Sequence, residues 1–203
     1  GTDVMIIMQA LGRCLVPEAY LFGLVMPGQL LALCANPAQQ ERWLAPLLEG
    51  EHQLALAWQE HTARYDAFDI LTQASQHDGQ WQLNGRKDVV MNLGNAAATL
   101  VTAQLPNGKL GVFIVTANTQ GVTSHTYRTM DNQPAGDLTL NSVTLPLENC
   151  LSEDAGDALA EVLALGRAAL CAEAIGAMET ACDQTLAYLK ERKQFGLPLA
   201  TFQ

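Results

Sequence analysis

The sequence predicts an α+β protein of several domains: N-terminal helices over residues 1–50, a central antiparallel β-barrel or sandwich over 51–153, and the first long helix of a C-terminal helical bundle over 154–203. Two observations predict this order. From about residue 158, apolar residues recur at three- and four-residue steps, which is the period of a helix with one buried face. Between residues 51 and 153 the apolar runs are instead short, and turn dipeptides separate several of them.

The first fifty residues have the pattern of helices. Residues 4–11 are apolar enough for a buried helix, and Pro27-Gly28 interrupts a second apolar stretch that runs to Cys34. Asn36 stands directly before a proline and is a suitable N-cap for a further helix. That helix is expected to end at Gly50, because glycine commonly follows the last turn of a helix.

Short apolar or alternating runs predict the strands of the β domain. These runs cover residues 54–58, 81–83, 89–91, 100–103, 112–115, 122–127 and 138–143. Turns are expected at the dipeptides Asp78-Gly79, Asn84-Gly85 and Asn107-Gly108, which are typical of tight hairpins. Strands at this spacing predict a small antiparallel barrel or sandwich.

The long helix is predicted to run without interruption toward residues 191–203, with Gly196 as its C-terminal stop. Small residues such as Ala168, Ala172 and Gly176 would let a neighbouring helix approach closely. A helix with apolar and small residues over much of its surface usually packs in a bundle of about four. Other helices are predicted only near the N-terminus, so either the chain is a fragment or another subunit completes the bundle.

Composition excludes several classes of partner. The 203 residues carry a net charge of −10, which disfavours nucleic acid and anionic membrane surfaces. No apolar run has the length of a membrane span, and the first residues carry no basic segment of a signal peptide. The 5 cysteines have no metal-ligand spacing, so we predict no metal site and a cytoplasmic protein with reduced thiols.

The segment 191–203 resembles the Glu-Arg-x-x-Phe-Gly-x-x-Leu-x-x-x-Gln segment of the acyl-CoA dehydrogenase family. In that family an Arg, a Phe and a Gln of this segment contact FAD held mainly by the neighbouring subunit, and the matching positions are Arg192, Phe195 and Gln203. The chemistry suits the role, because a guanidinium can hold a pyrophosphate bidentately and a Phe ring offers a flat apolar surface. Without the motif, Arg192 would be an ordinary cation at a helix C-terminus.

The order of helices, β domain and long helix is also that of this family. Because members of the family normally extend further at both ends, the resemblance implies that the chain is truncated at both ends. The family's two flavin-loop signatures align with residues 59–66 and 84–92. Arg64 and Tyr65 replace a Gly and a Ser, while Val89 and Met91 replace a Trp and a Thr. Glu60 is expected to order its loop rather than act as a base. The resemblance implies FAD contacts from these loops at Trp58, Gln59, Tyr65, Val89 and Met91.

The altered loops are most similar to one branch of the family, the small subunits of two-subunit enzymes such as pimeloyl-CoA dehydrogenase. The run 169–179 has the same similarity. In most members the catalytic Glu lies beyond the position of Gln203, and in a minority it lies at the position of Gly166, which has no side chain. Arg167 matches a substrate-side Arg, although a surface or ion-pair role is equally compatible with its position.

The resemblance therefore implies a dehydrogenase that removes hydrogen from an acyl-CoA, using FAD and an electron-transfer flavoprotein. A homo- or hetero-oligomer, dimeric or tetrameric, is expected. The alternative is a non-catalytic partner subunit whose own flavin pocket is degraded, because Arg64, Tyr65, Val89 and Met91 remove groups that bind flavin. Acyl chain length is left open by the sequence.

Overall fold

The computed structural model describes residues 1–64 and 66–202. Tyr65 and Gln203, two of the predicted FAD contacts, lie outside the described residues. The chain forms two compact units, one of residues 17–164 and the other of residues 1–16 together with 165–203. The division into residues 1–50, 51–153 and 154–203 follows secondary structure instead and stays a prediction.

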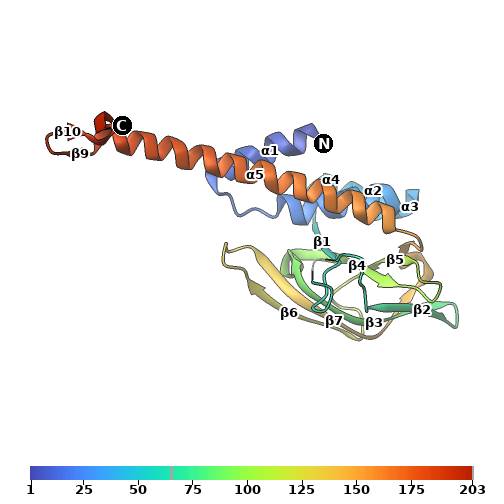
Figure 1. The fold of residues 1–203 in the computed structure, drawn as a ribbon. Coiled ribbons are helices and arrows are strands. Elements are labelled where there is room, and N and C mark those ends of the chain that lie inside the picture. The colour runs from blue at the N-terminus through green and yellow to red at the C-terminus, as the bar shows by residue number, and fades with distance from the viewer. Residues whose placement is uncertain (65, 203) are drawn as a thin grey trace. The chain divides into compact units, whose positions relative to one another are not determined.

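The elements follow the predicted order of helices, strands and one long helix (Figure 1). The helices are α1 (Thr2–Cys14), α2 (Met26–Cys34), α3 (Pro37–Gln39), α4 (Ala45–Leu48) and α5 (Gly156–Glu191), with π-helical turns at Tyr20–Val25 and Gln40–Leu44. The strands are β1 (Gln53–Ala57), β2 (Gln73–His77), β3 (Gln80–Met91), β4 (Ala96–Gln104), β5 (Leu110–Val115), β6 (Val122–Arg128), β7 (Pro134–Pro146), β8 (Cys150–Ser152), β9 (Lys193–Gln194) and β10 (Leu197–Pro198).

Local sequence signals explain the helix ends in the unit of residues 17–164. Asn36 caps α3 as predicted, and its side chain accepts the N–H of Gln39 at 3.0 Å while the Gln39 side chain accepts the N–H of Asn36. Gly50 lies just after α4 and has φ 77°, so the helical segment ends there as predicted. Pro27 does not interrupt the helical path, because the π-helical turn of Tyr20–Val25 leads directly into α2, whose first turn contains Pro27.

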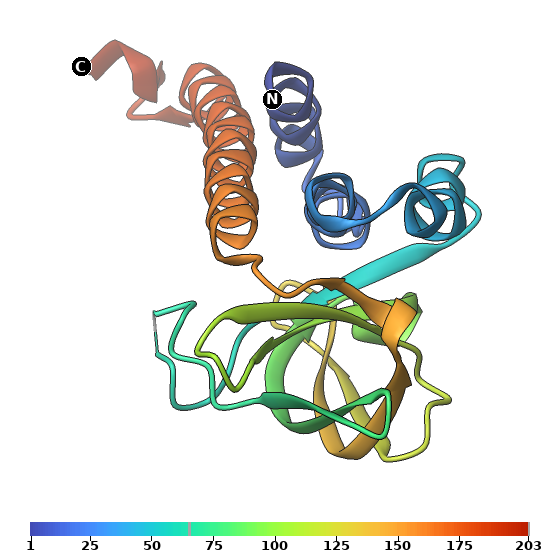
Figure 2. The ribbon, with the colours of Figure 1, turned by 90° about the vertical axis from the view of Figure 1, so that its right-hand side faces the viewer.

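Strands β1 to β8 form one curled sheet in the order β6-β7-β3-β2-β4-β5-β8, with β1 paired to β4 (Figure 2). Most neighbours are antiparallel, as predicted, whereas β1 pairs with β4 in parallel and β2 has one parallel contact with β4. No hairpin joins β1 to β4, so nothing in their connection forces an antiparallel arrangement. The helices of residues 20–48 lie along one side of this sheet (Figure 2).

Two of the three predicted turns are found. Asp78-Gly79 joins β2 to β3, and Asn107-Gly108 lies between β4 and β5. The turn predicted at Asn84-Gly85 is wrong, because β3 continues through both residues. Gly85 is needed there for close approach, since a Cβ atom would lie 2.6 Å from the Cα of Thr72.

The core of the β domain is apolar and continuous between the strands. Trp81 on β3 and Phe113 on β5 meet edge to face, with their ring centroids 5.0 Å apart. Both side chains are buried, Trp81 with 3% of its surface exposed. They pack with small and branched residues of β1, β4 and β7, so the inner face of the sheet is filled by side chains.

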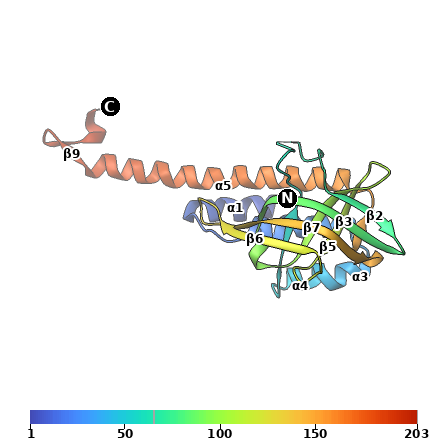
Figure 3. The same ribbon diagram turned by 90° about the horizontal axis from the view of Figure 1, so that it is seen from below.

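In the unit of residues 1–16 and 165–203, α1 lies beside α5 (Figure 3). The helices approach closely where glycine removes the side chain: a Cβ on Gly12 would clash with the carbonyl oxygen of Glu173, and a Cβ on Gly176 with that of Gln9. The Arg13 guanidinium joins the pair through an ion pair with Glu179 at 2.6 Å. Small residues therefore serve helix packing in this unit, as the sequence predicts.

The end of α5 differs from the prediction. The helix ends at Glu191, and Gly196 lies instead in the turn between β9 and β10, where its φ is 83°. Phe195 precedes it with φ 51°. None of the helices in the described part of the chain is both long enough and apolar enough to cross a membrane.

Candidate functional site

A cavity of about 160 Å³ opens in the unit of residues 17–164, between its helices and the strands β1 and β3. Its walls are apolar except for one amide and one carboxylate. They consist of Phe22, Met26, Leu56, Trp58, Gln59, Asp88, Val89, Val90 and Met91.

The cavity brings together four residues that the sequence predicts as a cofactor site. Trp58 and Gln59 follow the end of β1, while Val89 and Met91 lie near the end of β3. Two segments far apart in the sequence thus meet at one wall. That these four residues contact FAD stays a prediction.

The β3 wall of the cavity contains a β-bulge. Asp88 and Val89 on β3 both stand opposite the single residue Asp137 on β7, because Lys87 pairs with Leu138 and Val90 with Gly136. Val89 has φ 51°, a left-handed conformation that is uncommon for a β-branched residue. The bulge turns the Val89 side chain, which is 42% exposed, toward the cavity.

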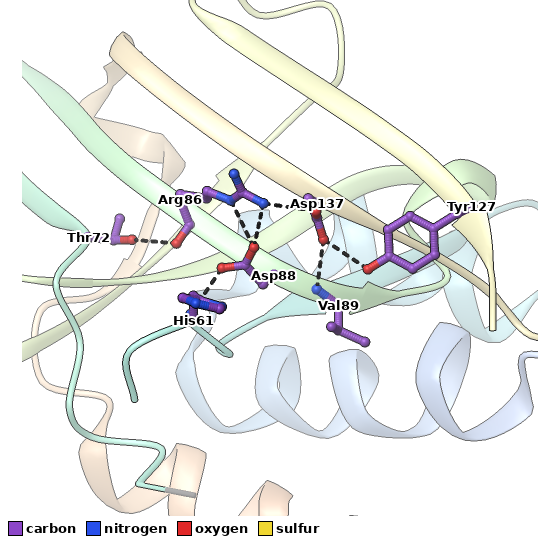
Figure 4. A network of polar contacts seen from close by, with 7 residues as sticks. All are labelled: His61, Thr72, Arg86, Asp88, Val89, Tyr127 and Asp137. Carbon is purple, nitrogen blue, oxygen red and sulfur yellow. Dashed lines mark hydrogen bonds and ion pairs between the residues drawn. The ribbon is translucent and has the colours of Figure 1, made fainter. Parts of the chain in front are cut away.

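The carboxylate of Asp137 accepts hydrogen bonds from several polar groups around this bulge (Figure 4). It accepts the backbone N–H of Val89 at 3.1 Å and the hydroxyl of Tyr127 at 2.9 Å. The Arg86 guanidinium lies 3.0 Å from its other oxygen. Burial alone would raise the pKa of Asp137, but these donors hold that pKa below its usual range, so the carboxylate is ionised at neutral pH.

A second carboxylate, that of Asp88, forms part of the cavity wall itself. It accepts a hydrogen bond from Arg86 at 2.8 Å and the backbone N–H of His61 at 3.0 Å (Figure 4). The N–H of Asp88 in turn donates to the carbonyl of Gln59 at 3.0 Å. The segment that follows β1 and the bulged end of β3, which both line the cavity, are therefore joined directly to each other.

Glu60 and Lys87, which directly adjoin the cavity residues Gln59 and Asp88 in the sequence, form a buried ion pair at 2.6 Å. The Glu60 carboxylate also accepts the N–H groups of Leu71 at 2.7 Å and Thr72 at 3.1 Å, so it ties together both ends of the loop that follows it. The predicted loop-ordering role of Glu60 is thus confirmed. Burial lowers the pKa of Lys87 to about 8, despite the opposing effect of Glu60.

The remaining predicted site residues that the structure describes are Gly166, Arg167, Arg192 and Phe195, and all of them lie in the unit of residues 1–16 and 165–203. Arg167 is exposed on α5, and Gly166 offers no carboxylate. Arg192 directly follows the end of α5 and is exposed, and Phe195 is 94% exposed and meets only Phe202, at a centroid distance of 6.4 Å, among the ring contacts described. Their roles toward FAD and substrate stay predictions. Across residues 1–64 and 66–202, no three His, Cys, Asp or Glu side chains are grouped to hold a metal ion.

Sequence reasoning missed residues of two kinds. Phe22 and Met26 line the cavity but come from helical segments that have no pattern distinguishing a cavity wall from a core. Asp137 and Tyr127 do not line the cavity but form the hydrogen bonds beside the bulge, and no signal in the sequence shows which β7 residue stands opposite Val89. Only the strand register identifies them.

The order of helices, a curled β domain and a long helix is that of a solved acyl-CoA dehydrogenase structure. Residues 55–143 match the middle domain of acyl-CoA dehydrogenases, and residues 156–203 match the C-terminal domain. The chain belongs to the acyl-CoA dehydrogenase family.

Individual relatives support this assignment. A short-chain-specific acyl-CoA dehydrogenase of Megasphaera elsdenii is 34% identical over 196 residues, which cover 85% of this chain and 50% of the relative. The solved butyryl-CoA dehydrogenase of Megasphaera elsdenii superposes with a TM-score of 0.89 at 29% identity, covering 98% of this chain and 55% of that one. The chain spans about half the length of the curated relatives it matches.

The ChsE4-ChsE5 complex of Mycobacterium tuberculosis is a third similar structure. Its TM-score is 0.87 at 25% identity, with coverage of 99% of this chain and 53% of that one. Two-protein complexes therefore occur among the structural neighbours. The narrower resemblance to pimeloyl-CoA dehydrogenase small subunits is not confirmed by these comparisons.

Proposed function

We propose that this chain is part of an FAD-dependent acyl-CoA dehydrogenase, which forms the α,β double bond of an acyl-CoA thioester. In this reaction Cα loses a proton to a base and Cβ loses a hydride, so both electrons of the Cβ–H bond leave the substrate. Bound FAD supplies the hydride acceptor, and an electron-transfer flavoprotein is the proposed next acceptor. Family membership together with the cavity beside Val89 and Met91 carries this proposal.

The cavity wall fits the flat ring system of a flavin in part. Trp58, Val89 and Met91 offer apolar surfaces to the faces of a ring, and the Gln59 amide is a polar side chain with donors. In this proposal Arg192, Phe195 and Gln203 contact FAD held mainly by a neighbouring subunit, so the protein works as a homo- or hetero-oligomer. Arg167 would lie toward the acyl-CoA.

No carboxylate stands at the family position of Gly166. A base that removes the Cα proton needs a pKa near the working pH and hydrogen-bond reach of that proton. We therefore place the base in another part of the protein or on a partner subunit. Glu60 is not a candidate, because its carboxylate is already occupied by Lys87, Leu71 and Thr72.

A second candidate function is a partner subunit that supports FAD bound mainly to another chain, as in a two-subunit enzyme of the pimeloyl-CoA dehydrogenase kind. This second candidate is favoured by the small number of hydrogen-bond donors that the cavity wall offers to a ligand. The Val89 N–H is donated to Asp137 and is unavailable to a ligand, and Met91 has a thioether in place of a hydroxyl donor. The acidic side chain on the wall, Asp88, accepts hydrogen bonds but cannot donate them when ionised.

A visible absorption spectrum of the full-length protein, purified alone and then co-expressed with its nearest partner subunit, tests the proposal. A flavin band at about 450 nm in the protein alone, bleached by an acyl-CoA, supports the dehydrogenase. Flavin that appears only with the partner supports the second candidate. Absence of flavin in both preparations contradicts both.

A matched pair of tryptophan variants locates the flavin. Trp58 lines the cavity, whereas Trp43 lies in a π-helical turn and packs against His52. Trp58→Ala is expected to lower the flavin content, and Trp43→Ala is expected to leave it unchanged. Equal flavin content in the two variants would place FAD elsewhere.

A further inference from the structure

The ladder between β3 and β7 contains two bulges built in the same way. At one, Asn141 and Ser142 on β7 stand opposite Asn84, and the Asn84 side chain accepts the N–H of Ser142 at 2.7 Å. At the other, Asp88 and Val89 on β3 stand opposite Asp137, whose side chain accepts the N–H of Val89. In each case a short side chain on the facing strand holds the extra residue.

The two held residues share one backbone conformation. Ser142 has φ 49° and Val89 has φ 51°. A left-handed conformation costs a non-glycine residue free energy and persists only where its surroundings fix it. For Val89 the cost is greater, because its branched Cβ is crowded by the following carbonyl.

The hydrogen bond that holds the Val89 N–H is stronger than the hydrogen bonds that hold Ser142. Asn84 is neutral, and Ser142 donates to it through both its N–H and its hydroxyl. Asp137 carries a full charge and is itself held by Tyr127 and by Arg86. Hydrogen bonds to an ionised acceptor are about twice as strong as neutral ones.

We propose that Asp137 is the positioning residue of the cavity: by holding the N–H of Val89, it keeps the Asp88–Val89 bulge in the conformation that forms the β3 wall. Asp137 itself does not line the cavity. Its effect on a ligand passes through the backbone of Val89 and through the placement of Asp88. The choice of FAD as the ligand rests on the proposed function, whereas the backbone role does not.

The test is a cycle of variants in the full-length protein with FAD as the probe. Asp137→Ala removes the acceptor and is expected to weaken FAD binding about tenfold, as for loss of one charge-assisted hydrogen bond. Val89→Gly alone is expected to weaken binding slightly, because it removes a side chain from the wall. In the Asp137→Ala background the same glycine is expected to strengthen binding, because glycine adopts φ near +51° unaided.

Asn84→Ala is the control, since it releases the corresponding bulge at Ser142. It is expected to lower thermal stability as Asp137→Ala does but to leave FAD affinity and the flavin spectrum unchanged. Asp137→Asn retains one acceptor oxygen and replaces Asp137→Ala in the FAD-binding measurement if the alanine variant does not fold. Equal FAD affinity in the Asp137 and Asn84 variants would overturn the inference, and so would glycine failing to strengthen binding in the Asp137→Ala background.

A second readout separates this inference from the proposed function. If the unaltered protein binds no FAD with or without a partner, the proposed function fails, and the positioning role is tested by amide hydrogen exchange. Exchange in the peptide of residues 86–91 is expected to become at least about tenfold faster in Asp137→Ala, which removes the acceptor of the Val89 N–H, and to stay unchanged in Asn84→Ala, because the opening free energy falls only at the released bulge. Unchanged exchange in Asp137→Ala refutes the positioning role.

Discussion

Replacing Glu60 by Gln is expected to be the most damaging single substitution of a charged residue in the β domain. Lys87 has none of its surface exposed, and its Nζ contacts the Glu60 carboxylate at 2.6 Å and the Thr102 hydroxyl at 3.0 Å. The substitution keeps the size of the side chain but removes its charge. Lys87 is then a buried cation without a counter-ion, which is among the costliest changes in a protein interior.

The magnitude follows from the burial of both partners. Removing one member of a buried ion pair typically costs about 3–5 kcal/mol. The cation is already unfavourable in the unaltered protein, because a pKa lowered from 10.5 to about 8 corresponds to about 3 kcal/mol. In the variant Lys87 escapes part of the cost by losing its proton, so we expect a loss of about 3 kcal/mol near pH 6.

The dependence on pH identifies Lys87 as the cause. Its pKa is lower in the folded chain than in the unfolded one, so the unfolded chain binds more protons above pH 8 and the contribution of this group to stability rises with pH. In Glu60→Gln this rise begins at lower pH, because the partner that keeps the proton on Lys87 is gone. The difference in stability between the two proteins should therefore narrow from pH 6 to pH 9.

Urea unfolding followed by tryptophan fluorescence measures this difference at both pH values. The control is Asp154→Asn, which breaks the exposed pair with Lys109 and should cost less than about 1 kcal/mol at either pH. A loss in Glu60→Gln that stays constant between pH 6 and pH 9, or that does not exceed the loss in the control, would refute the account of Lys87 as a buried charge held by Glu60.

Three further outcomes are expected. Trp81→Ala should destabilise the protein by about 3–5 kcal/mol in urea unfolding, because it empties the centre of the β-domain core. Gly12→Ala should loosen α1 from α5, since the new methyl group meets the carbonyl of Glu173, and limited proteolysis near the N-terminus should then be faster than in the unaltered protein. Burial and the neighbouring Asp137 carboxylate raise the pKa of Tyr127, so its phenol should ionise at lower pH in Asp137→Asn when followed by ultraviolet absorption.

The sequence predicted the elements whose signals are local. Asn36 capped its helix, the period of residues from about 158 predicted the long helix α5 although not its end at Glu191, and the turns at Asp78-Gly79 and Asn107-Gly108 were found. Asn84-Gly85 has the same dipeptide chemistry but lies inside β3. Its role depends on Thr72 and Ser142, which are distant in the sequence, so no local rule could separate it from a hairpin turn.

The candidate site likewise contains residues that local motifs predict and others that depend on strand pairing. Trp58, Gln59, Val89 and Met91 could be predicted from motifs, because each motif is a short continuous segment. No local pattern predicts that β2 forms from the polar run Gln73–His77 or that Asp137 faces the bulge. Both depend on which strands pair and in which register, and register is a property of the whole sheet.

The conformation of Val89 bears on the choice between the two proposed functions. A valine with φ 51° at a bulge contributes little to stability, so relief of strain in Val89→Gly should offset the added chain entropy, leaving the free energy of unfolding within about 1 kcal/mol of the unaltered value. Its side chain lines the cavity rather than the core. Val89 is unfavourable for the fold and is fixed there by the Asp137 carboxylate, which Tyr127 and Arg86 hold in turn, so its conformation is best explained by what it does to the cavity.

Val89→Gly therefore distinguishes a working cavity from a degraded one. If the cavity binds FAD in the co-expressed complex through its own wall, the variant should keep its stability and bind FAD more weakly. If the chain supports FAD only through residues such as Arg192 and Phe195, both quantities should stay unchanged. A variant that loses more than about 2 kcal/mol of stability would show instead that Val89 is an ordinary packing residue, and the argument from its strained backbone would fail.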